Sequence, residues 1–179
     1  MKTTLVLPLL ILLTTSVIAQ VYVLPFQYTE SGHIFMEAEI VNTGKKGIFV
    51  FDTGGKNVLN ERVFTGKENT FDIKLGNLVI SNQSFVKHDY TKVFTTPDLQ
   101  KLYGMLGPDI AKEYIWQVDY RKQLIVVTKK LAELSPSTLV AKSPLIIKRK
   151  FGLTSIQLQL KTETLPGWWF TIDTGSPEK

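Results

Sequence analysis

Residues 47–54 read Gly-Ile-Phe-Val-Phe-Asp-Thr-Gly, and residues 167–175 read Gly-Trp-Trp-Phe-Thr-Ile-Asp-Thr-Gly. Each stretch is a short apolar run that ends in Asp-Thr-Gly, and this pattern predicts a buried strand followed by a turn. A lone buried carboxylate is costly, so two carboxylates in matched positions are expected to meet and to share a proton. The two aspartates, Asp52 and Asp173, are therefore the candidate functional pair.

The sequence before each Asp-Thr-Gly is repeated as well. Residues 36–40 (Met-Glu-Ala-Glu-Ile) and residues 156–160 (Ile-Gln-Leu-Gln-Leu) both alternate apolar and polar side chains, and they align after a one-residue adjustment in the turn. The two aspartates are 121 residues apart (173 − 52), a period that indicates a duplicated domain and not a solenoid. One Asp-Thr-Gly could be an ordinary turn, because Asp and Gly favour turns, but two copies in the same context favour a shared function.

The composition is that of a globular protein. Of the 179 residues, 44% are hydrophobic and 21% are charged, which argues against large-scale disorder. The formal net charge is +5, but the basic residues are scattered and do not form a stripe with aromatic residues, so no nucleic-acid partner is expected. The absence of cysteine excludes a cysteine nucleophile. With only His33 and His88 besides carboxylates, no metal site and no other cofactor is expected.

The N-terminus has the pattern of a secretory signal peptide over residues 1–19. Lys2 precedes an apolar stretch from Leu5 to Leu13, and the small residue Ala19 stands at the expected cleavage position. This apolar core is short for a membrane span, so no stable span is expected, and an uncleaved anchor is the alternative. The chain is therefore predicted to be exported, and to be periplasmic or secreted after cleavage.

From Gln20 onward, closely spaced short strands predict an all-β barrel or sandwich. One hairpin turns at residues 42–44 and leads into the strand that carries Asp52, and a second hairpin turns at residues 76–77 (Gly-Asn). Residues 121–122 mark a third hairpin turn, between two apolar strands near the end of the first unit.

One short helix is expected to interrupt these strands. It begins at Pro108, because Pro and the acidic Asp109 both suit the first turn of a helix. The preceding residues 102–107 read as a buried strand bracketed by glycines. Residues 131–144, which contain two prolines and three serines, look like a linker before the second unit.

This order of motifs resembles one lobe of the retropepsin-like (pepsin-type) aspartic proteases. In that family an apolar-apolar-Gly strand crosses behind the catalytic turn and precedes a short helix, and residues 105–107 (Met-Leu-Gly) match it here. The hairpin at residues 76–77 stands where the family carries its flap. The resemblance implies an all-β, retropepsin-like acid-protease barrel with one short helix, followed by an incomplete second copy.

The domain organisation that follows has four parts. They are a signal peptide over 1–19, a retropepsin-like lobe over 20–130, a linker over 131–144 and the truncated start of a second lobe over 145–179.

The resemblance also implies the chemistry of an aspartic endopeptidase that acts on polypeptides without a cofactor. Asp52 and Asp173 would share one proton, the ionised member activating a water and the protonated member hydrogen-bonding the carbonyl oxygen of the scissile amide. The other candidate site residues support the two active-site turns: Thr53, Gly54, Thr174, Gly175 and Ser176.

Two features depart from the family pattern. Gly55 follows the first Asp-Thr-Gly, where the family usually has Ser or Ala, and only six residues follow Asp173, whereas the first lobe uses 75 residues from Asp52 to Val127 (127 − 52). Three functions therefore stay open. The chain is the N-terminal part of a two-lobed protease with an Asp52–Asp173 dyad, or a homodimer with Asp52 from two chains, or a non-catalytic module that binds peptides by strand addition.

Overall fold

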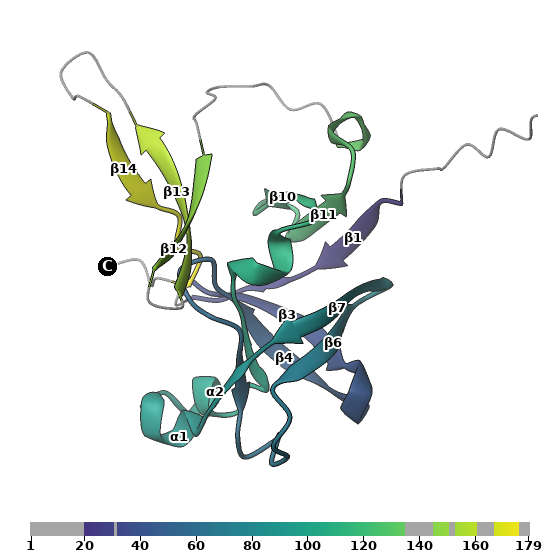
Figure 1. Cartoon of the computed structure of the whole chain (residues 1–179), viewed down its shortest axis with the longest axis vertical. Helices are drawn as coiled ribbons and strands as arrows, with labels where there is room; N and C mark the ends of the chain where they lie inside the picture. Colours follow the sequence, from purple (N-terminus) through teal and green to yellow (C-terminus); the bar gives the residue numbers. More distant parts are fainter. Residues whose placement is uncertain (1–19, 31, 135–144, 151–152, 161–166, 176–179) are drawn as a thin grey trace, which may run out of the picture.

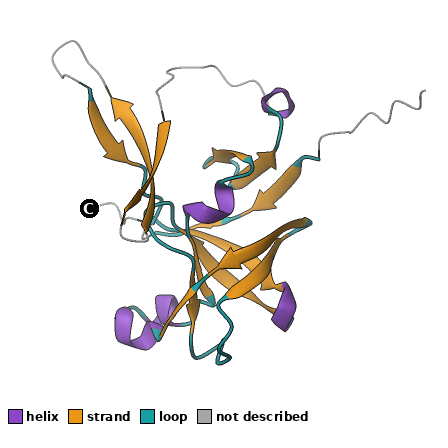
Figure 2. Ribbon diagram, in the orientation of Figure 1, coloured by secondary structure: helices purple, strands orange, loops and turns teal. Residues whose placement is uncertain are grey.

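The structure is a computed structural model that describes residues 20–30, 32–134, 145–150, 153–160 and 167–175. The described chain consists mainly of β-strands with a few short helical turns, so the all-β prediction is confirmed (Figures 1 and 2). The predicted signal peptide, residues 135–144 of the predicted linker, and Ser176 lie outside the described residues, and the predicted domain boundaries stay predictions.

The strands fall into two groups along the chain. Those before residue 130 are β1 (Tyr22–Pro25), β2 (Gln27–Tyr28), β3 (Ile34–Ile40), β4 (Lys45–Phe51), β5 (Val58–Asn60), β6 (Thr70–Leu75), β7 (Leu78–Ser84), β8 (Val86–His88), β9 (Gly104–Leu106), β10 (Ile115–Asp119) and β11 (Leu124–Thr128). Those after it are β12 (Leu145–Lys150), β13 (Leu153–Leu160) and β14 (Trp168–Thr171). The helical turns are η1 (Val41–Thr43), α1 (Tyr90–Val93), α2 (Pro97–Gln100), η2 (Pro108–Ala111) and η3 (Leu131–Glu133).

The first group forms a large curled sheet in the order β7-β6-β3-β4-β9-β5-β8, with β2 on the edge of β3, and a small sheet β1-β11-β10. Within the large sheet β4 pairs antiparallel with β3 and parallel with β9, and β9 pairs antiparallel with β5. The strand before the first Asp-Thr-Gly is therefore held between two neighbours. β12, β13 and β14 form a separate antiparallel sheet (Figure 1).

The main core follows from the alternation of side chains along β3. Ile34, Met36, Ala38 and Ile40 are all buried on one face, and they pack with residues of β4, β6, β7 and β11 in one hydrophobic cluster. Burying an aliphatic or aromatic side chain of this size contributes about 1.5–3 kcal/mol, so this face stabilises the curled sheet and holds the end of β4 in place.

A second, smaller cluster lies on the other side of β4. Val50, Val58, Tyr90 and Leu102 are buried there, with Phe35, Phe94, Leu99 and Met105 packed against them. Because Tyr90 and Phe94 belong to the segment of α1, and Leu99 belongs to α2, the short helices cover this face of the sheet.

The helix predicted at Pro108 is corrected by the structure. Residues 108–111 form a four-residue 3-10 helix, η2, and the chain then turns directly into β10 at Ile115. The α-helices are α1 and α2, which the sequence analysis did not predict because each has only four residues, too few to show helical periodicity.

The prediction of a flap at residues 76–77 is also wrong. Leu75 and Leu78, on either side of the turn, are fully buried, and a side chain at Gly76 would lie 3.4 Å from Leu24 of β1. The tip of this hairpin therefore packs on the core of the first unit instead of standing free above the first Asp-Thr-Gly turn.

The second sheet repeats the β2-β3-β4 arrangement with a different register from the predicted one. Phe51, the residue before Asp52, is paired with Ile34, and Ile172, the residue before Asp173, donates a backbone hydrogen bond to Ile156 at 2.8 Å. Ile156 is therefore equivalent to Ile34, two residues from the predicted match with Met36. A shift of two keeps each side chain on its face of the sheet.

One face of this second sheet is apolar and largely exposed. Leu145, Leu158 and Phe170 are cross-strand neighbours, and Leu145 and Phe170 are 54% and 42% exposed. The equivalent of Phe170 in the first unit, Phe49, is fully buried. Within the described residues, the second sheet thus lacks the cover that the first unit provides.

Candidate active site

The two Asp-Thr-Gly turns follow equivalent strands. β4 ends at Phe51, and the backbone N–H of Asp52 donates to the carbonyl of Leu106 on β9 at 2.9 Å. β14 ends at Thr171, and Asp173 follows after Ile172. The structure brings the turns together although they are 121 residues apart in the chain, because hydrogen bonds join them directly.

Thr53 and Thr174 form these hydrogen bonds reciprocally. The N–H of Thr53 donates to the hydroxyl of Thr174 at 3.1 Å, and the N–H of Thr174 donates to the hydroxyl of Thr53 at 3.1 Å. Each hydroxyl in turn donates at 2.8 Å to the carbonyl before the opposite aspartate, that of Ile172 or of Phe51. The two turns are therefore related by an approximate twofold symmetry.

The glycines of both turns bring the carboxylates close. The N–H of Gly54 donates to Asp52 Oδ1 at 2.8 Å, and the N–H of Gly175 donates to Asp173 Oδ1 at 3.0 Å. A Cβ at Gly54 would lie 2.6 Å from Asp173 Oδ2, and a Cβ at Gly175 would lie 2.6 Å from Asp52 Oδ1. Since real Cβ atoms do not approach so closely, only glycine allows this arrangement.

The carboxyl group of Asp52 has a raised pKa. Burial raises the pKa of Asp52 to about 6, and the neighbouring Asp173 adds to the rise through its charge and a side-chain hydrogen bond. The backbone N–H groups of Gly54 and Gly55 oppose this rise by stabilising the carboxylate. Asp173 is more exposed than Asp52. Because the two carboxyls interact, the protonation belongs to the pair.

A side chain at Gly55 would force its neighbours to move. A Cβ at this position would lie 2.6 Å from Asp52 Oδ2 and 2.8 Å from the sulfur of Met105. The absence of the usual Ser or Ala therefore has a local cause, because Met105 of β9 and the Asp52 carboxylate fill the space that a side chain would need.

Asn57 supports the loop after the first Asp-Thr-Gly turn, and the sequence analysis did not identify it. It is only 3% exposed, its side-chain oxygen accepts from the N–H of Gly107 at 2.8 Å, and its amide donates to the carbonyl of Ser84 at 3.2 Å. It thus ties the loop after Asp52 to the end of β9 and to β7. A single polar residue between Lys56 and the short strand β5 carries no periodic signal, so only the structure identifies it.

A cleft of about 820 Å³ lies beside the second cluster. One wall consists of residues 27–30 with His33 and Phe35, and the other consists of Thr96, Asp98 and Leu99 of the α1–α2 segment. His33 and Phe35 line the cleft, and Ile34 lies between them on β3. Ile34 is paired with Phe51, the residue before Asp52, so this wall of the cleft leads to the first Asp-Thr-Gly turn.

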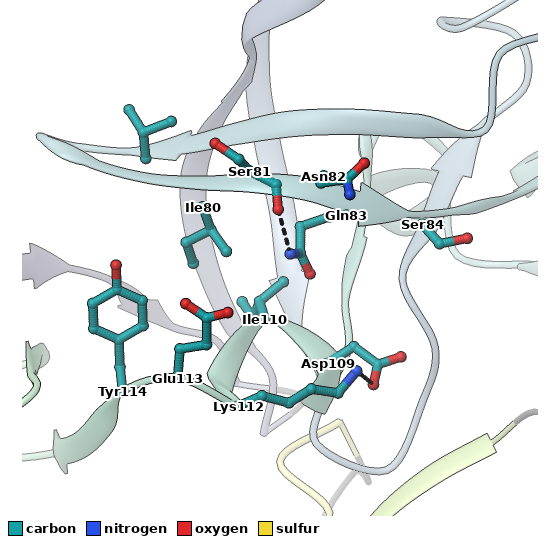
Figure 3. A pocket seen from close by; sticks show the side chains of 11 residues that line it. Ile80, Ser81, Asn82, Gln83, Ser84, Asp109, Ile110, Lys112, Glu113 and Tyr114 are labelled. Carbon is teal, nitrogen blue, oxygen red and sulfur yellow. Dashed lines mark hydrogen bonds and ion pairs between the residues drawn. The ribbon is translucent and has the colours of Figure 1, made fainter.

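Another hollow, of about 510 Å³, lies between β7 and η2 (Figure 3). Lys112 forms an ion pair with Asp109 at one side, and the Gln83 side chain donates to the carbonyl of Ser81 at the other. Asp109 also accepts a hydrogen bond from Thr154 of β13 at 2.9 Å, which joins the first unit to the second sheet. The lining of this hollow includes neither Asp52 nor Asp173.

The described residues contain no cluster of three or more histidines or carboxylates that could hold a metal ion. No helix in the same part of the chain is long and apolar enough to cross a membrane.

No protein-family model matches the chain, and no curated protein matches it. Among solved structures, the chain is similar to the crystal structure of a retropepsin-like aspartic protease from Rickettsia conorii. The two are 15% identical, the match covers 62% of this chain and 92% of that chain, and the TM-score is 0.43.

Proposed function

We propose that the protein is an aspartic endopeptidase whose dyad is Asp52 and Asp173 of one chain. The observation that carries this proposal is the reciprocal hydrogen bonding of Thr53 and Thr174, which presents the two aspartates to each other. The glycines at 54 and 175 support it further, because each leaves room for the opposite carboxylate.

The proposed reaction uses one proton shared by the dyad. The ionised carboxyl takes a proton from a water, whose oxygen attacks the carbonyl carbon of the scissile amide, while the protonated carboxyl donates to the carbonyl oxygen. The resulting tetrahedral intermediate breaks its C–N bond as the amide nitrogen takes a proton from the dyad. The pKa of about 6 for Asp52 supports this step, because it keeps the proton on the pair in mildly acidic solution.

The substrate in this proposal is an extended polypeptide. The cleft between residues 27–35 and the α1–α2 segment supports this choice, since one of its walls leads to the catalytic turn. It includes β2, an edge strand of two residues on which a peptide could add as a further strand. Export to the periplasm or the exterior, and the absence of a nucleic-acid partner, are part of the same proposal and rest on the sequence.

A non-catalytic peptide-binding module is the second candidate. Gly55 favours it, because no side-chain hydroxyl is available there to hydrogen-bond Asp52. A homodimer with Asp52 from two chains is less well supported, since Asp173 already stands opposite Asp52 within one chain.

Cleavage of an unfolded protein substrate at pH 4–6 by the full chain tests the proposal. Asp52→Asn should abolish cleavage and leave the circular dichroism spectrum unchanged. Asp72→Asn is the matched control, because Asp72 lies on β6 and its carboxylate accepts a hydrogen bond from the N–H of Asn82, which an asparagine oxygen can also accept. Cleavage retained by Asp52→Asn would overturn the enzymatic proposal.

A further inference from the structure

Thr154 of β13 has a buried hydroxyl that forms a hydrogen bond outside its own sheet. The side chain is only 5% exposed, and its hydroxyl donates to Asp109 Oδ1, in η2 of the first unit, at 2.9 Å. The same oxygen forms an ion pair with Lys112, which restrains the carboxylate (Figure 3). A hydrogen bond to a carboxylate is stronger than one between neutral groups, so this bond is a specific link between the first unit and the second sheet.

The internal repeat does not account for this threonine. Ile156 is equivalent to Ile34, an offset of 122 residues on this strand (156 − 34), so Thr154 is equivalent to Gly32 (154 − 122). Gly32 has no side chain and adopts a positive φ of 82°. The hydroxyl at position 154 therefore has no counterpart in the first unit, as expected of a group that joins the two units.

On the side of the first unit, the link leads to Asp52. Asp109 follows Leu106 by three residues (109 − 106), and the carbonyl of Leu106 accepts from the N–H of Asp52 at 2.9 Å. Between them, the N–H of Gly107 donates to the buried side chain of Asn57 at 2.8 Å, which restrains the start of η2. The carboxylate that accepts from the second sheet therefore lies on the segment that holds the first Asp-Thr-Gly turn.

On the side of the second sheet, the link leads to Asp173. Thr154 lies two residues before Ile156 on β13 (156 − 154), and the carbonyl of Ile156 accepts from the N–H of Ile172, the residue before Asp173, at 2.8 Å. The turn after β14 is itself tied to the first unit through Thr174. Two neighbouring strands of the second sheet are therefore each attached to the first unit.

The second attachment matters because apolar packing leaves part of the second sheet uncovered. Leu145 and Phe170, on its apolar face, are 54% and 42% exposed, whereas Phe49, the equivalent of Phe170, is fully buried in the first unit. Hydrogen bonds at a single turn would allow the sheet to rotate about that turn. A further hydrogen bond, from β13 to η2, opposes this rotation.

We propose that Thr154 and Asp109 are positioning residues for the dyad: their hydrogen bond holds the second sheet against η2 and so keeps Asp173 opposite Asp52. Both residues act through the backbone of their neighbours and take no part in the reaction. The effect on the two turns does not require that the protein is an enzyme, whereas the effect on cleavage rests on the proposed function.

The test is amide hydrogen exchange by NMR in the full chain, with Thr154→Val compared with the wild type. The N–H groups of Thr53 and Thr174 report on the contact between the turns, and the N–H of Phe64, which donates to the carbonyl of Asn60, reports on the first unit alone. We expect the turn amides to exchange about 3- to 10-fold faster relative to Phe64, as the loss of one hydrogen bond of ordinary net strength implies. An unchanged ratio would overturn the inference.

Two further threonine variants separate positioning from general stability. Thr154→Ser keeps the hydroxyl and should restore the wild-type ratio. Thr128→Val is the matched control, because Thr128 is fully buried on β11 and its hydroxyl accepts from the N–H of Lys130 within the first unit. It should leave the ratio unchanged, and an equal rise in this control would contradict the proposed role of Thr154.

Asp109→Ala keeps the inference testable if Thr154→Val does not fold, because it removes the acceptor from a partly exposed position and should raise the same ratio. Where both variants fold, Thr154→Val should have no further effect in the Asp109→Ala background. A full additional increase there would mean that the threonine acts through another group, and it would overturn the inference.

The exchange measurement is independent of activity. If Thr154→Val opens the turns but the wild type cleaves no peptide, the inference stands and the proposed function fails. If the wild type is active, Thr154→Val should lower kcat more than it raises KM, and Thr154→Ser should restore kcat.

Discussion

Thr53 and Thr174 bind each other through two N–H to hydroxyl hydrogen bonds of equal length, 3.1 Å in each direction. Their hydroxyls continue the network to the carbonyls of Ile172 and Phe51, the residues that precede the two aspartates. The relative position of Asp52 and Asp173 is therefore set by hydrogen bonds that cross between the two turns.

Replacing Thr53 with valine tests this network. Thr53→Val keeps the shape of the side chain but leaves the N–H of Thr174 and the carbonyl of Ile172 without this partner, in a position where Thr53 is only 6% exposed. We expect the free energy of unfolding in urea to fall by about 1–3 kcal/mol. Thr171→Val, at an exposed site of β14, is the control and should change it by less than about 0.5 kcal/mol. Equal effects of the two substitutions would argue against the network.

A side chain at Gly175 should separate the two carboxylates. The Cβ of Gly175→Ala would meet Asp52 Oδ1 at 2.6 Å, so one of the turns must move. The expected result is a loss of about 1–3 kcal/mol of stability together with the loss of cleavage. Gly44→Ala, whose Cβ would meet no atom within 4 Å, is the control for cleavage, although the positive φ of Gly44 carries its own cost in stability. Full activity in Gly175→Ala would mean that the carboxylates need not be close.

The acidity of Asp52 predicts a pH-dependent stability. An aspartate in the unfolded chain has a pKa of about 3.9, whereas burial and Asp173 raise the pKa of Asp52 to about 6 in the folded protein. Between these values the folded state binds more protons than the unfolded state, so the free energy of unfolding falls as the pH rises from about 4 to about 6.

Asp52→Asn removes this titration and keeps an oxygen that can accept from the N–H of Gly54. Above pH 6 the variant should be more stable than the wild type by on the order of 1 kcal/mol, a figure reduced for the partial exposure of the dyad. Below pH 4 the two should be equally stable. Urea unfolding at pH 3.5 and pH 7.5 measures both differences, and a wild type that gains stability over this range relative to Asp52→Asn would contradict the raised pKa.

Asn57→Ala should destabilise the loop that follows the first Asp-Thr-Gly turn. The change removes the acceptor for the N–H of Gly107 and the donor to the carbonyl of Ser84. Asn57 is only 3% exposed, so water cannot easily replace either hydrogen bond. We expect a loss of about 2–3 kcal/mol in the free energy of unfolding. Asn42→Ala is the matched control, because Asn42 accepts one exposed hydrogen bond, from the N–H of Asp72, and its removal should cost less than about 1 kcal/mol. A small effect at Asn57 would show that the loop does not depend on it.

The all-β class and most strands could be predicted from the sequence, because they depend on local patterns. Residues 34–40 alternate and bury every second side chain, and Gly44 adopts the positive φ that the predicted turn requires. The pairing of Asp52 with Asp173 was predictable for another reason: two isolated carboxylates at the ends of buried strands are costly unless they interact.

The features that were missed depend on contacts distant in sequence. β5 and α1 are too short to show a period, and the hairpin at residues 76–77 reads as a free flap until Leu75 and Leu78 are seen in the core. The double role of Asn57, which joins the loop after Asp52 to the end of β9 and to β7, is a property of the packed structure. Asn57 belongs to no motif that chain order alone could show.

Cleavage by Asp173→Asn tests the central claim most directly, because it distinguishes a dyad within one chain from a dyad of two Asp52 residues. The rate should be measured on one unfolded protein substrate at pH 5 over a hundredfold range of enzyme concentration. We predict that Asp173→Asn and Asp52→Asn each lower the rate by about 10²- to 10⁴-fold, and that the wild-type rate per chain is independent of enzyme concentration. An active Asp173→Asn variant would contradict the claim that Asp52 and Asp173 form the catalytic pair.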